Sequence, residues 1–143
     1  MSNADTIQAI TDNLITVLKG LNLSMSIRPY DDTKSFPATI PPGGDIFYKG
    51  ESFEFTFGER PKYAEADFEI RLIAEDREPE DQTRNLQILV HSVRDALTIN
   101  ALNVGNLASS KLVSRVTTEN VIIENKDAIA VLTYQVKVRY REV

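Results

Sequence analysis

The stretch 78–100 most constrains the fold, because its pattern is helical while both of its flanks have strand-like patterns. Its apolar side chains recur at helical spacing and form a single stripe, made of Leu86, Leu89, Val90, Val93 and Leu97. Pro79 occupies a position typical of the first helical turn, and the acidic residues after it suit the positive end of the helix dipole. The sequence therefore predicts a helix that lies across a sheet.

Strict alternation of apolar and polar residues marks two long strands, over 63–74 and 128–140. A period of two predicts one buried and one wet face for each strand. The buried face of the second strand is predicted to consist of Ala130, Leu132, Tyr134, Val136, Val138 and Tyr140. A further strand is predicted over 52–57, with its three phenylalanines buried.

Shorter elements complete the predicted order. They are a helix over 6–19 and short strands over 24–28, 45–48, 111–118 and 121–124. Asp5 or Thr6 is the expected N-cap of the first helix. Lys49-Gly50 is expected to separate two strands, and a break is expected at 119–120.

Two amphipathic helices packed on one face of a mostly antiparallel sheet form a two-layer α+β fold, which is the predicted fold class. The other face of the sheet would be polar and charged. At 143 residues the chain is expected to form one domain, 1–143. No apolar run approaches the roughly 18 residues that a membrane helix needs, and no secretory signal is recognisable, so neither is predicted.

The segment 31–50 is long for a connection within a compact domain. It places Phe36, Ile40, Phe47 and Tyr48 among prolines and glycines. Long loops with apolar residues are often functional. Two interpretations stay open: an extended arm that becomes ordered on a partner, with these four residues as the contacts, or a plain packed loop.

Charge is unevenly distributed along the chain. The segment 51–81 holds eleven acidic and four basic residues, a balance of −7, whereas the whole chain carries −5. Much of this acidity falls on the wet strand faces, at Glu54, Glu65, Asp67 and Glu69. An acidic surface argues against a grip on nucleic acid, because phosphate binding needs Lys and Arg. The simple interpretation is a solvated face.

A row of basic residues lies on the last strand, at Lys137, Arg139 and Arg141. One interpretation is a charged strand face that resists edge-to-edge aggregation. The other is a subunit contact, in which this row meets the acidic residues of a neighbouring copy. Opposite patches on one molecule allow a head-to-tail contact, which closes into a ring when the rotation permits.

Residue types with catalytic or ligating chemistry are sparse. The chain has no cysteine, and its single histidine, His91, falls on the side of the central helix opposite the Leu86/Val93/Leu97 stripe. The acidic clusters near 31–32 and 78–81 lack the calcium-loop pattern and are expected to be surface loop or helix N-terminus. No glycine-rich phosphate loop is present. The sequence therefore predicts neither an enzyme nor a cofactor or metal site.

The layout as a whole is similar to a known family. A helix over 6–19 precedes a short strand, and the proline-bearing segment 36–40 leads to an aromatic strand pair. A helix over 81–97 follows an acidic loop, and the chain closes on a hairpin that ends with 134–140. This order resembles the tail-terminator (tail-completion, minor tail protein U-like) proteins of long-tailed bacteriophages and prophages.

The resemblance implies a small α+β structural protein of the virion tail, assembled in the cytoplasm of the bacterial host. Such proteins form a ring, typically of six copies, that caps the tail tube and presents a surface to the head connector. The implied partners are other copies of the chain, the tail tube protein and the head-connector protein. DNA would pass through the ring without specific binding, and an acidic lumen would suit that passage because like charges repel.

Two other hypotheses remain open. The chain could be another phage neck component, such as a head-closure or connector protein, which only its binding partner would distinguish. It could also be a small α+β enzyme or ligand-binding domain with a pocket between helix and sheet. That reading requires convergent polar groups in an apolar pocket.

Overall fold

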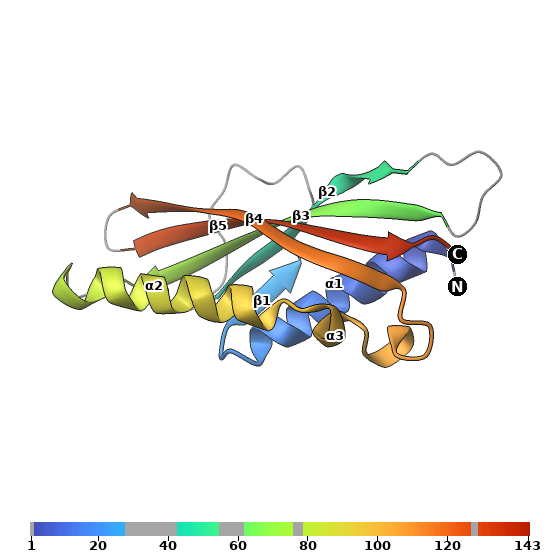
Figure 1. Ribbon diagram of the computed structural model, residues 1–143. Coiled ribbons are helices and arrows are strands. Elements are labelled where there is room, and N and C mark those ends of the chain that lie inside the picture. The colour runs from blue at the N-terminus through green and yellow to red at the C-terminus, as the bar shows by residue number, and fades with distance from the viewer. Residues whose placement is uncertain (1, 28–42, 55–61, 76–78, 127–128) are drawn as a thin grey trace.

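A computed structural model describes residues 2–27, 43–54, 62–75, 79–126 and 129–143. The helices lie on one side of a five-stranded sheet (Figure 1). In chain order the elements are α1 (Asn3–Lys19), β1 (Ser24–Ile27), β2 (Gly43–Phe53), β3 (Tyr63–Glu75), α2 (Pro79–Ala96), α3 (Ile99–Leu102), the 3₁₀ helix η1 (Gly105–Leu107), β4 (Val113–Lys126) and β5 (Ile129–Arg141). The predicted two-layer α+β class is confirmed.

The strands follow the order β1-β2-β3-β5-β4 across the sheet. The pairs β2–β3, β3–β5 and β5–β4 are antiparallel, and only β1 pairs with its neighbour, β2, in parallel. The sheet is therefore mostly antiparallel, as the sequence predicts. Among the described helices, none is long and apolar enough to cross a membrane.

The core lies between the helices and the inner face of the sheet, which is the face toward α1 and α2. All six predicted inward residues of β5 are buried. Three apolar side chains of α1, at Ile10, Leu14 and Leu18, are also fully buried. Alternation in the strand and helical spacing in α1 thus bring the two apolar surfaces together.

The N-cap of α1 is Ser2 and not Asp5 or Thr6, so that prediction is wrong. The Ser2 hydroxyl accepts a hydrogen bond from the Asp5 amide at 3.1 Å, and the Asp5 carboxylate accepts one from the Ser2 amide at 3.0 Å. This reciprocal pair is a capping box, which satisfies two amide donors at once. Asp5 takes part in the cap, but from the third helical position.

The central helix is less deeply packed than predicted. Of its five stripe residues, Val93 and Leu97 are buried, whereas Leu86, Leu89 and Val90 are half-buried against the core. α2 ends at Ala96, because Thr98 starts a new helical turn by accepting a hydrogen bond from the Ala101 amide at 3.2 Å. The helix predicted over 81–97 is thus confirmed as α2, and the end of the stretch 78–100 belongs to the separate short helix α3.

β2 is one continuous strand where the sequence suggested two. Its pairing with β3 shifts between Tyr48 and Gly50, where a β-bulge accommodates an extra residue. Gly50 has φ of 112°, a conformation that side chains disfavour, so the glycine permits a bulge and does not end the strand. The predicted burial of Phe53 is wrong, because this residue lies exposed at the end of β2. The other two phenylalanines lie outside the described residues.

β4 also runs without interruption. The break expected at 119–120 is a register shift between Thr118 and Asn120, after which pairing with β5 resumes. A bulge in an edge strand leaves the ladder continuous while bending it locally. The two predicted short strands therefore form a single strand of 14 residues.

Candidate interaction surface

The outer face of the sheet, directed away from the helices, carries most of the charged residues singled out in the sequence. Cross-strand register places Glu65 of β3 opposite Arg139 of β5, and Asp67 opposite Lys137. The predicted acidic and basic sets therefore lie side by side on neighbouring strands of one chain. Opposite charges on facing positions of a strand pair favour that pairing.

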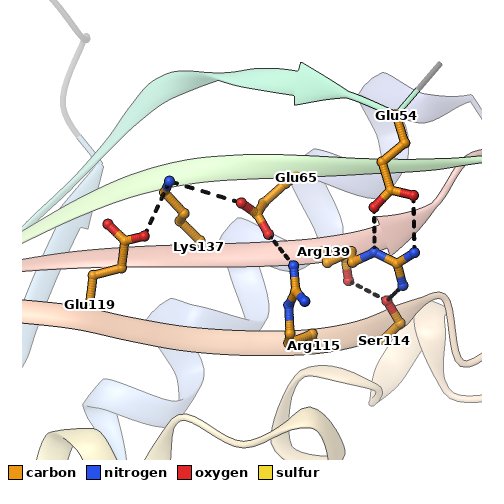
Figure 2. A network of polar contacts seen from close by, with 7 residues as sticks. All are labelled: Glu54, Glu65, Ser114, Arg115, Glu119, Lys137 and Arg139. Atoms are coloured by element: carbon orange, nitrogen blue, oxygen red, sulfur yellow. Dashed lines mark hydrogen bonds and ion pairs between the residues drawn. The ribbon is translucent and has the colours of Figure 1, made fainter.

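Arg139 stands at the centre of the first group of contacts (Figure 2). Its Nε lies 2.8 Å from Glu54 Oε1 and its Nη2 lies 3.1 Å from Glu54 Oε2, so the pair is bidentate. Its Nη1 donates to the Ser114 hydroxyl at 3.1 Å, and its guanidinium lies 3.7 Å from the centre of the Tyr63 ring. Together these contacts connect the residue that follows β2 with β5, β4 and the start of β3.

Glu65 and Lys137 form the second group. Glu65 accepts a hydrogen bond from Arg115 Nη2 at 2.7 Å and lies 4.0 Å from Lys137 Nζ. Lys137 also lies 3.2 Å from Glu119. The Arg115 side chain is largely exposed, so its pair with Glu65 contributes little to stability. The outer face is therefore charged but locally balanced.

These contacts shift the pKa values of Glu54, Lys137 and Arg139. The hydrogen bond from Arg139 lowers the pKa of Glu54, while the bond to Glu119 raises the pKa of Lys137. The bond to Glu54 likewise raises the pKa of Arg139. Each of these three pKa shifts favours the charged form of its group.

Glu69 departs from the predicted wet face, because it is buried. It accepts a hydrogen bond from Gln135 at 3.2 Å and lies 3.1 Å from Arg71 Nε. The Arg71 guanidinium lies 5.1 Å from the centre of the Phe47 ring, which is fully buried on this same outer face. The prediction of a wet face is thus correct for the half with Glu65 and wrong for the half around Phe47.

Sequence reasoning missed Glu51, which lies on the inner face. The bulge at Gly50 places Glu51 opposite Ala66, an inward-facing core residue. Its carboxylate accepts a hydrogen bond from the Tyr48 hydroxyl at 2.5 Å and another from the Tyr140 hydroxyl. Burial, followed by these bonds, raises the pKa of both tyrosines. Local sequence holds no signal for this arrangement, since a bulge reverses the alternation that would assign the face.

The predicted partner-binding loop is only partly described. Phe36 and Ile40 lie outside the described residues. Phe47 and Tyr48 belong to β2, so the short strand predicted over 45–48 is confirmed and the loop or arm interpretation is wrong for these two residues. Phe47 is buried, whereas Tyr48 is exposed and makes an edge-on contact with Phe68, with ring centres 5.9 Å apart.

The remaining candidates have simple placements. Arg141 is exposed near the end of β5, and His91 is exposed on the outer side of α2, as the sequence predicts. A shallow hollow beside His91 is lined by residues of α2 alone, among them Arg84 and Asp95. Within the described ranges, no group of three or more His, Cys, Asp or Glu side chains is arranged to hold a metal ion.

Comparisons with known proteins add distant structural similarity and nothing at the level of sequence. No protein-family model and no curated protein matches the sequence. Among solved structures, the chain is similar to one in the virion of a native gene transfer agent (GTA) particle. The two are 13% identical with a TM-score of 0.30, over 90% of this chain and 84% of the other. A similarity this distant carries no functional argument.

Proposed function

We propose that this chain is a structural subunit of a phage or prophage tail, one that forms a ring on the tail tube in the manner of the tail terminators. The observation that supports the proposal is the order of the elements. A capped N-terminal helix, a short strand, two longer strands, a second helix and a closing hairpin follow one another as the resemblance requires. The partners of this function are other copies, the tail tube protein and the head-connector protein.

The charge network bears on how such subunits would meet. Arg139 and Lys137 already pair with acidic residues of their own chain. A contact in which they bind a neighbour's acidic face would have to replace these pairs, with little net gain. We therefore assign the exposed outer face to the lumen or to solvent and not to the subunit seam. DNA would pass a balanced surface of this kind without specific binding.

Mass in solution tests the proposal directly. The purified chain is passed through size exclusion with light scattering over a concentration series, and the largest species is imaged by electron microscopy. We expect a ring-sized species, or a monomer that binds the ends of purified tail tubes. A chain that stays monomeric at every concentration and leaves tube ends bare would contradict the proposed function.

A panel of metabolites and metal ions tests the competing hypothesis, a small enzyme or ligand-binding domain. A ligand that binds only the folded state raises the midpoint of thermal unfolding in a saturable manner. A ring subunit should show no saturable shift with any member of the panel. A saturable shift together with a monomeric mass would instead indicate a ligand-binding domain.

A further inference from the structure

We propose that successive copies join through the two open edges of the sheet, with β4 of one copy pairing antiparallel to β2 of the next. The proposal rests on the ring function above and names its seam. A strand at a sheet edge presents backbone donors and acceptors that another strand can pair with. The occupant of each edge is therefore a second copy of this chain.

The first open edge belongs to β4. This strand has only β5 as a strand neighbour in the described sheet, and its residues are exposed along most of its length after the first two. Its first residue, Val113, is already covered, because the Asn103 side chain donates to its carbonyl at 2.9 Å and accepts from its amide at 3.0 Å. The side-chain amide of Asn103 thus makes the two backbone hydrogen bonds at Val113 that a neighbouring strand would otherwise make. The open edge begins at the next residue.

The second open edge belongs to β2. β1 pairs only with residues 43–46, so the rest of β2 has no strand on that side within the described part of the chain. Tyr48, Lys49, Ser52 and Phe53 are exposed there. Residues 47–53 therefore form an open edge on the side of the sheet opposite β4.

The two edges match in position and direction. Cross-strand register places Ser52 level with Arg115 and Phe47 level with Asn120, so the open run 47–53 of β2 matches residues 113–120 of β4. Neighbouring strands from β2 to β4 alternate in direction. If the sheet continues into the next copy, β4 and the incoming β2 run antiparallel. The contact uses two different surfaces, and a repeated contact of that kind closes into a ring when its rotation permits.

Exposed aromatic side chains accompany the open run of β2, where Phe53 is 63% exposed and Tyr48 38% exposed. On β4, the exposed Ile122 and Ile123 lie level with the part of β2 that β1 already covers, so they fall outside the matched run. The exposed residues of β4 within the matched run are Arg115, Thr117, Glu119 and Asn120. Pairing between copies would cover this run and the open run of β2 at once.

The absence of cysteine from the chain allows a clean crosslinking test. Ser52→Cys and Thr117→Cys each place one thiol on the outer face, at an exposed position of β2 and of β4. Assembled samples are treated with a short bis-maleimide, which tolerates a shift of register. We expect neither variant alone to crosslink, a mixture of the two to give dimers, and the double variant to give a ladder.

Other outcomes overturn the proposal. Dimers formed by Thr117→Cys alone would indicate that β4 pairs with itself in a two-fold dimer. Rings that are visible by microscopy but yield no crosslink in the mixture would show that the seam lies elsewhere, while the ring function stands. A chain that forms no rings and binds no tube ends would overturn the proposed function as well.

Charged substitutions give an independent measure with a matched control. Thr117→Lys and Asn120→Lys each place a lysine on the β4 edge, at an exposed position level with the open run of β2, so the fold should survive. We expect each to raise the concentration needed for assembly at least about tenfold. The control is Asn106→Lys in η1, where the asparagine is exposed and belongs to neither edge. Equal assembly by all three variants would contradict the edge pairing.

Discussion

Tyr134 is a buried polar group for which the fold supplies no partner. Its hydroxyl is fully buried and makes no hydrogen bond in the described structure. An unsatisfied buried hydroxyl costs free energy, so its removal should be neutral or favourable. We expect Tyr134→Phe to leave the free energy of unfolding unchanged or to raise it by about 1 kcal/mol, as measured by urea denaturation. Tyr140→Phe, which removes the bond to Glu51, should instead lower it by about 1.5 kcal/mol.

The same residue makes stability depend on alkaline pH. Burial raises the pKa of Tyr134 above the ordinary value of 10.0. Above pH 10 the Tyr134 hydroxyl loses its proton in the unfolded chain but keeps it in the folded chain. The free energy of unfolding is therefore unaffected by this group below pH 10 and declines as the pH rises above 10. Tyr134→Phe should therefore lose stability less steeply than the parent between about pH 10 and 11. An equally steep decline in both proteins would contradict this assignment.

Gly44 is required by the close approach of two strands. It falls in the segment 31–50 that the sequence predicted as a loop or arm, but it is a buried residue of β2. A Cβ there would lie 1.8 Å from the Arg71 carbonyl oxygen. We expect Gly44→Ala to reduce the free energy of unfolding by about 3 kcal/mol, because the backbones must separate to admit the methyl group. Gly20→Ala, at a right-handed helix end, is the control and should be close to neutral.

At the scale of elements, the two main helices contribute unequally to the core. α1 buries Leu14 completely, whereas α2 leaves Leu89 half-buried. Deleting a fully buried leucine side chain loses its transfer free energy and creates a cavity. We expect Leu14→Ala to cost about 3 kcal/mol and Leu89→Ala roughly half of that in urea denaturation. Equal losses would indicate that α2 packs as tightly as α1.

At the scale of the whole molecule, we expect assembly not to depend on the exposed charges of β5. Arg139 forms an ion pair with Glu54 of its own chain, so reversing the charge of Arg139 would disturb the fold as well as any interface. Arg141 is exposed and provides the cleaner variant. If the seam is an edge pairing, Arg141→Glu and a rise in salt from about 0.05 to 0.5 M should leave the mass of the assembled species unchanged. If the assembled species dissociates in both cases, the subunits meet through a charged contact and not through an edge pairing.

The sequence by itself determined the elements whose pattern is long and regular. The inward residues of β5, the apolar face of α1 and the α+β class follow from periods of 2 and 3.6, which depend on local backbone geometry alone. It also identified the charged strand faces, including Glu54, Glu65 and Arg139, although not that these residues pair with one another.

Tertiary structure decided whatever depends on contacts between distant segments. The bulge at Gly50 carries Glu51 to the inner face, and the Asn103 side chain covers the start of β4. Burial around Phe47 divides the outer face into two halves. Each arises from cross-strand register and packing, which a local pattern does not encode, because a one-residue shift reverses every face downstream. The open edges, on which the proposed seam depends, are likewise a property of strand order.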